Sequence, residues 1–162
     1  MYNKISYLGG SIFSNCMSLT DMYVIGNEEN LVSAIVVGDS VNVHFIPLVT
    51  ITLNGKSLNL GQNPVIFNSR TLVPLSEIFE AFGASVEWDD ETRTIMSAKD
   101  GTTIEIIIDS NEMKVGNSIK YLDVPARLVN GHVFIPLRAV SESFGYKVNW
   151  NADAWTATIE NL

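Results

Sequence analysis

The stretch Asn68-Ser-Arg-Thr-Leu-Val-Pro-Leu75 recurs 62 positions further along the chain as Asn130-Gly-His-Val-Phe-Ile-Pro-Leu137. The same shift places Glu80-Ala-Phe-Gly83 on Glu142-Ser-Phe-Gly145, and Trp88 on Trp150. Self-similarity at a fixed spacing of this size is typical of a repeated supersecondary unit. The sequence therefore predicts two tandem repeat units, at about residues 51–98 and 113–162.

Each unit is expected to contain one short amphipathic helix. In the first unit, apolar residues from Leu75 to Phe82 follow helical spacing, and Gly83 stands where a left-handed residue caps a helix. In the second unit, Leu137 and Phe144 keep the apolar stripe and Gly145 keeps the cap. Because the same pattern occurs twice, both helices are predicted to cover the core with the same face.

Strands are expected on both sides of each helix. Asn54-Gly55 predicts a tight hairpin, since both central positions of a type I′ turn need a positive φ. Alternating apolar residues predict strands at 85–88 and 94–96, and again at 147–150 and 156–159. The predicted fold class is α+β, with two pseudo-equivalent units that each pack a bent antiparallel sheet on one short helix. The apolar run at 101–108 is expected to join the two sheets.

The remaining residues predict a separate N-terminal segment. Strand-like runs at 22–25, 31–37 and 41–45 are separated by glycine-containing turns, which favours a small β-rich segment over residues 1–49. The repeat units then make up a domain over residues 50–162.

Composition narrows the class of protein. Of the 162 residues 46% are hydrophobic, which is enough to fill a core, and the net charge of −8 disfavours binding to nucleic acid. The apolar runs are too short to cross a membrane, so no membrane insertion is expected. The first twenty residues show no export signal, and the single cysteine, Cys16, cannot form an internal disulfide.

Catalysis and metal binding are not predicted. His44, His132 and Cys16 lack the spacing of metal ligands, and the serines lie in no nucleophile motif, so the chain is interpreted as non-enzymatic and without a cofactor. Glu80 and Glu142 occupy matched positions and are interpreted as serving the same structural role twice. A small enzyme that uses these glutamates is the less favoured reading.

The sequence pattern predicts a structural role for one group of residues and a ligand-binding role for another. The residues expected to be structural are Leu75, Phe82, Gly83, Trp88, Leu137, Phe144, Gly145 and Trp150. Trp155 replaces Arg93 of the first unit beside a polar turn. Two readings stay open for it, an exposed aromatic that stacks on sugar rings and, as the favoured alternative, partial burial at the interface of the two units. Tyr146, Asn149 and Asn151 are predicted to share this ligand site, with Tyr121 as a further aromatic.

Several motifs resemble a known family. They are Arg70-Thr-Leu-Val-Pro-Leu75, Glu80-Ala-Phe-Gly83 and Val86-Glu-Trp-Asp89, and in the second unit Phe134-Ile-Pro-Leu-Arg138, Glu142-Ser-Phe-Gly145 and Val148-Asn-Trp150. Together they resemble the stalk domain first described at the N-terminus of copper amine oxidases and found in surface proteins of Gram-positive bacteria. Ser76, His132 and Asn151 depart from the family pattern.

The resemblance implies a non-catalytic module that is extracellular or associated with the cell wall. Such a module would anchor or position a partner, and its partners would be cell-wall polysaccharide or a surface protein. The alternative is an accessory domain of a cell-wall hydrolase or an amine oxidase whose catalytic part is absent from this chain.

Overall fold

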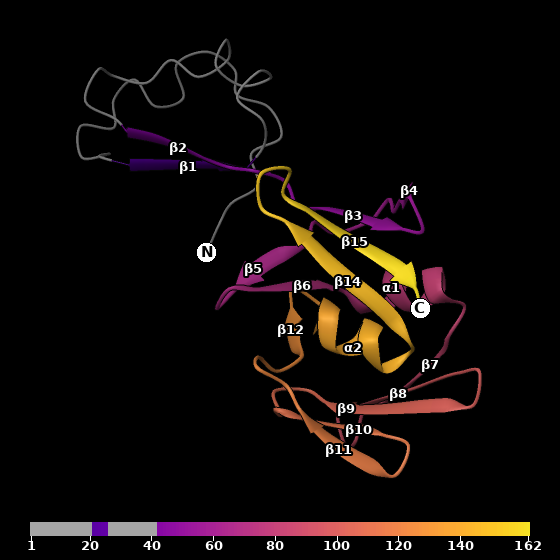
Figure 1. The fold of residues 1–162 in the computed structure, drawn as a ribbon. Coiled ribbons are helices and arrows are strands. Elements are labelled where there is room, and N and C mark those ends of the chain that lie inside the picture. The colour runs from indigo at the N-terminus through magenta and orange to yellow at the C-terminus, as the bar shows by residue number, and fades with distance from the viewer. Residues whose placement is uncertain (1–20, 26–41) are drawn as a thin grey trace. The chain divides into compact units, whose positions relative to one another are not determined.

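The computed structural model describes residues 21–25 and 42–162 (Figure 1). The chain separates into two compact units, Met1–Leu48 and Val49–Leu162. In the first unit, β1 (Asp21–Ile25) pairs in parallel with β2 (Asn42–Ile46). The strand expected at 31–37 and the lone Cys16 lie outside the described residues.

The second unit passes twice through the same order of elements, namely two hairpins, a helix and a further hairpin. Its first half contains β3 (Thr50–Leu53), β4 (Lys56–Ser57), β5 (Val65–Phe67), β6 (Arg70–Pro74), α1 (Leu75–Phe82), β7 (Ser85–Asp89), β8 (Thr94–Lys99) and β9 (Thr102–Ile107). Its second half contains β10 (Glu112–Val115), β11 (Ser118–Tyr121), β12 (Arg127–Val129), β13 (His132–Pro136), α2 (Leu137–Ser143), β14 (Tyr146–Asn151) and β15 (Thr156–Asn161). The predicted α+β class is confirmed.

Each of the three sheets in this unit combines strands from both halves. The strand orders are β11-β10-β9-β8-β7, β12-β13-β6-β5 and β14-β15-β3-β4. The sequence predicts one sheet for each repeat unit, and the structure instead exchanges strands between the halves. The physical reason is that short hairpins alone leave strand edges unpaired, and joining hairpins of both halves covers those edges. One pair, β15 with β3, is parallel.

The central sheet has an approximate two-fold symmetry. Strands β6 and β13 run antiparallel, and Val73 pairs with Ile135, its counterpart 62 positions later. On either side of this pair, Leu72 faces Pro136 and Phe134 faces Pro74, so the two halves exchange equivalent partners. Each residue of β6 in this pairing therefore has the same type of partner as its counterpart in β13, as a two-fold axis between the strands requires.

The ends of both helices follow local sequence rules. Each helix begins directly after a proline that ends a strand, where the missing proline N–H leaves no helical hydrogen bond unmade. Gly83 has a φ of 69° and its N–H donates to the carbonyl of Glu80, which is the left-handed cap that the sequence predicts. The C-cap of α2 is instead Phe144, with a φ of −93°, and the predicted cap residue Gly145, with a positive φ of 82°, comes one position later.

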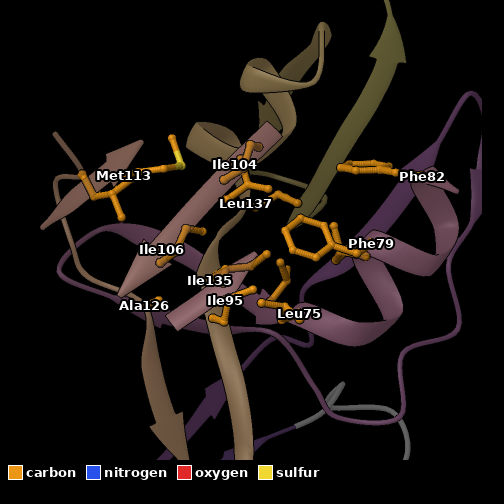
Figure 2. Packing of buried hydrophobic residues seen from close by; sticks show 14 of the residues in the cluster. Leu75, Phe79, Phe82, Ile95, Ile104, Ile106, Met113, Ala126, Ile135 and Leu137 are labelled. Atoms are coloured by element: carbon orange, nitrogen blue, oxygen red, sulfur yellow. The ribbon is translucent and has the colours of Figure 1, made fainter. Parts of the chain in front are cut away.

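The core lies where the two helices meet the sheets (Figure 2). Leu75, Phe82 and Leu137 are buried, and the half-buried Phe144 packs against them. The ring of Phe144 lies edge-on to that of Phe79, with 5.8 Å between the ring centroids. Because Phe79 and Phe144 belong to different halves, the aromatic contacts hold the halves together.

The expectation that Trp88 and Trp150 belong to the core is wrong. Their exposed fractions are 44% and 38%, although each lies on the core-facing side of its strand. Both strands, β7 and β14, are at the edges of their sheets. Alternation along a strand fixes the face that a side chain occupies, but at an edge strand that face extends beyond the residues that cover it.

Substitution of the buried Ser141 is expected to stabilise the second unit. It is fully buried at the position that corresponds to Phe79, and its Oγ has no hydrogen-bond partner among the described residues. We expect Ser141→Ala to raise the free energy of unfolding by about 1–2 kcal/mol, because it removes an unsatisfied hydroxyl and favours the helix. Chemical denaturation measures this change.

Ser143 in the same helix is the matched control for that substitution. Its Oγ donates to the carbonyl of Ala139 over 2.8 Å, so Ser143→Ala should bring no comparable gain. Equal gains from both substitutions would show that helix propensity alone, and not the buried hydroxyl, is responsible.

Candidate functional site

A groove of about 580 Å³ lies in the second unit, and we name it the tryptophan groove. It is formed by β5 and β6 of the first half together with β11, β13, α2, β14 and β15 of the second half. The side chains that characterise it are those of Ile66, Arg70, Tyr121, Asp123, Arg138, Glu142, Trp150 and Trp155. The groove therefore depends on the exchange of strands between the two halves.

Three aromatic side chains line the groove. Trp150 on β14 and Trp155 in the following turn meet edge to face, with their ring centroids 6.1 Å apart and their planes at 80°. Tyr121 is 75% exposed at the end of β11. The groove thus offers flat apolar surfaces with access to solvent, which is the chemistry of a binding site for a ligand with apolar faces.

The backbone of Trp155 is strained. Its φ of 47° lies in the left-handed region, where bulky side chains are disfavoured by about 1–3 kcal/mol. The turn demands this conformation, since Arg93 at the corresponding position has a φ of 54°. A hydrogen bond from the N–H of Thr50 to the carbonyl of Trp155 fixes the same position. The left-handed conformation is thus a property of this turn in both halves, and Trp155 adopts it in the second half.

An asparagine closes the turn that carries Trp155. The Oδ1 of Asn151 accepts the N–H of Ala154 over 3.0 Å. In the corresponding turn of the first half, the Asp89 carboxylate accepts the N–H groups of Thr92 and Glu91. The hydrogen bonds from Thr92, the backbone one first, hold the pKa of Asp89 below its ordinary value. Because the side chain of Asn151 does not titrate, the turn of the tryptophan groove is closed at any ordinary pH.

The groove contains charges of both signs. The Nε of Arg70 donates to the Oδ2 of Asp123 over 2.6 Å, in an exposed ion pair between the two halves. Arg138 and Glu142 stand four positions apart on α2, where the sequence suggests a helical ion pair, but the ion pairs of the described residues do not include one between them. Their side chains therefore remain available to a ligand on this part of the chain.

The structure brings together only part of the predicted ligand site. Trp155 lines the groove and is half-buried, as the alternative of partial burial expects, and Tyr121 lines the groove as well. Tyr146 is buried and stacks on Phe82 with 4.4 Å between the ring centroids, so the prediction that it is an exposed platform is wrong. Asn149 alternates with Trp150 on β14, which directs it to the opposite face, where its Nδ2 donates to Glu160. Asn151 acts through the turn described above.

Sequence reasoning missed several residues of the groove. Arg70 and Ile66 come from the first half, and no local pattern shows that β6 lies against α2. Trp150 was assigned to the core. The one signal that could have found Trp150 is its nearness in sequence to Trp155 across a single turn.

The histidine and the two matched glutamates considered in the sequence lie on three different elements of the fold, β13, α1 and α2. Among the described residues, no three or more His, Cys, Asp or Glu side chains form a group that could hold a metal ion. His132 is exposed on β13. Of the two matched glutamates, Glu142 lines the groove and Glu80 does not. Neither α1 nor α2 is long and apolar enough to cross a membrane.

Comparison with known proteins places the groove within a matched domain. The family model for the copper amine oxidase N-terminal domain matches residues 52–159. A protein of Brevibacillus choshinensis named "Protease inhibitor" is 26% identical over 153 residues, which make up 93% of this chain and 43% of that protein. The chain thus spans less than half the length of this relative.

Proposed function

Because the chain belongs to the copper amine oxidase N-terminal domain family, whose namesake is a non-catalytic accessory domain, we propose that it is a non-catalytic binding module of the cell surface. In this proposal the tryptophan groove holds cell-wall polysaccharide and so anchors or positions whatever is attached to the module. The extracellular or cell-wall location forms part of the proposal.

The observation that carries this function is the pair of tryptophans in the groove. Trp150 and Trp155 meet edge to face at a site that also contains Arg138 and Glu142, which have polar groups free to bond to hydroxyls. Apolar rings beside hydrogen-bonding groups suit a sugar, which has C–H groups on its faces and hydroxyls around its edge.

The test is the retention of the purified chain on a cell-wall fraction. Trp155→Gly is expected to abolish retention while changing the free energy of unfolding by less than about 1 kcal/mol, because relief of backbone strain offsets the lost ring contacts. Trp88→Ala is the matched control, since it removes an exposed tryptophan at an edge strand outside the groove. Retention that survives Trp155→Gly, or that Trp88→Ala removes equally, would contradict the proposal.

We also propose that the second unit consists of two tandem repeats. The shared order of elements and the symmetric pairing of β6 with β13 support this reading. Trp155 and Arg138 of the groove have no equivalents in the first repeat, because Arg93 and Ser76 stand at the matched positions.

A second candidate function follows from the named relative. Similarity over 93% of this chain favours a shared property with the Brevibacillus choshinensis protein, and inhibition of a protease is the property that its name states. Residual activity of a panel of secreted serine and metalloproteases, measured with the chain in excess, tests this candidate. Stoichiometric inhibition of a protease that Trp155→Gly does not affect would show that the chain acts as an inhibitor through a surface other than the groove.

A further inference from the structure

We propose that the ligand of the tryptophan groove is an uncharged glycan chain, and that Arg138 and Glu142 together select against charged polymers. This inference rests on the proposed function and specifies the chemical class of ligand that the groove accepts.

The balance of charge in the groove is the first argument. Its charged side chains are Arg70, Asp123, Arg138 and Glu142, so their formal charges cancel. The whole chain, in contrast, carries a net charge of −8. An anionic wall polymer would be repelled by the protein as a whole and would meet no compensating positive charge in the groove. A neutral chain meets no such opposition.

The second argument concerns which charges remain available. The Arg70 guanidinium is already engaged by Asp123, with the Nε and Oδ2 2.6 Å apart, so this arginine is partly neutralised. Arg138 and Glu142 lie one helical turn apart on α2 and face the same groove. An anion placed beside Arg138 would also approach Glu142, and a cation beside Glu142 would also approach Arg138.

The third argument is the match of donors and acceptors. An arginine side chain only donates hydrogen bonds, and an ionised glutamate only accepts them. A sugar hydroxyl does both, so neighbouring hydroxyls can accept from Arg138 and donate to Glu142 at once. The rings of Trp150 and Trp155 then supply surface for the C–H face of the sugar. Each group in the groove thereby finds a partner on a neutral glycan.

The experiment measures retention on protease-treated cell walls as a function of sodium chloride, between about 0.05 and 0.5 M. For an uncharged glycan, the affinity of the unaltered chain should change by less than about two-fold over this range. Arg138→Gln and Glu142→Gln should each weaken binding by about five-fold at every salt concentration, because each loses a charge-assisted hydrogen bond. Glu80→Gln, at the matched position of α1 outside the groove, should leave binding unchanged.

A soluble hexamer of N-acetylglucosamine and a polyglycerol phosphate serve as defined competitors. The neutral oligosaccharide should displace the chain from the walls, and the polyanion should not. Stronger binding on neutralising Glu142 would identify an anionic ligand and overturn the inference. A steep fall in affinity with salt would overturn it as well, because it would show that the ligand is charged. Stronger binding on neutralising Arg138 would identify a cationic ligand and would also overturn the inference.

The possible failures are distinguishable. Retention on untreated walls that protease treatment removes would point to a protein ligand and overturn the glycan assignment. If no wall fraction retains the unaltered chain, the proposed function itself fails and this inference fails with it. Retention that depends steeply on salt, or that strengthens when Arg138 or Glu142 is neutralised, leaves the proposed function in place and removes only the assignment to an uncharged glycan.

Discussion

Phe79→Ala is expected to lower the free energy of unfolding of the second unit by about 3–5 kcal/mol, the range for truncating a buried phenylalanine. Phe79 is fully buried, and its ring meets that of Phe144 from the other half at 5.8 Å. The substitution therefore opens a cavity at the junction of the halves and removes an aromatic contact across it. Denaturant-induced unfolding, followed by the fluorescence of the tryptophans, measures the loss.

Trp88→Ala is the control for that prediction. The indole of Trp88 is larger than the ring of Phe79, but it is 44% exposed, so its removal should cost well under half as much. Equal losses of unfolding free energy for the two substitutions would contradict this prediction, because they would show that Trp88 contributes to stability as a fully buried side chain does.

Cutting the second unit between its halves is expected to unfold both fragments as monomers. A cut after Asp109 lies between β9 and β10 and leaves every helix and strand intact. It nevertheless deprives β6 of β13, β3 of β15 and β9 of β10, so each of the three sheets loses one of its strand pairs and is divided in two. The exposed edges and the open core leave neither fragment enough buried surface to offset its conformational entropy.

The fragments 49–109 and 110–162 test this expectation directly. Each alone should show circular dichroism of an unfolded chain, and mixing them in equal amounts should restore the sheet signal with a cooperative unfolding transition. The first fragment folding by itself as a stable monomer would mean that each repeat carries its own sheet, as the sequence pattern predicts, and would contradict the exchanged strand orders.

Local elements were predictable because their causes are local. The spacing from Leu75 to Phe82 and the glycine at 83 determine where α1 begins and ends, and Asn54-Gly55 forms the expected hairpin with φ values of 49° and 80°. Strand partners were not predictable in the same way. When two halves share one pattern, a strand finds equally suitable partners in its own half and in the other, and the sequence pattern does not distinguish them.

The candidate site was predictable only around Trp155. Its replacement of Arg93 and its position beside a polar turn single it out in the sequence, and the structure shows that it and Tyr121 line one groove. Tyr146 was misplaced because its distance to Phe82 depends on tertiary packing. Arg70 and Asp123 join the groove only through the exchange of strands, which no motif records.

The symmetric register of β6 and β13 also bears on the ancestry of the domain. A pairing that reads the same from Val73 and from Ile135 is what two copies of one short chain would form as a homodimer. Duplication and fusion of the gene for such a chain would leave the present arrangement, with each copy free to diverge. The two halves now differ at matched positions, since the half that contains α2, β14 and β15 has Trp155 and Arg138 where the other half has Arg93 and Ser76. A symmetric ancestor would have carried two identical surfaces, and divergence of its two copies would leave the tryptophan and the arginine on one of them alone.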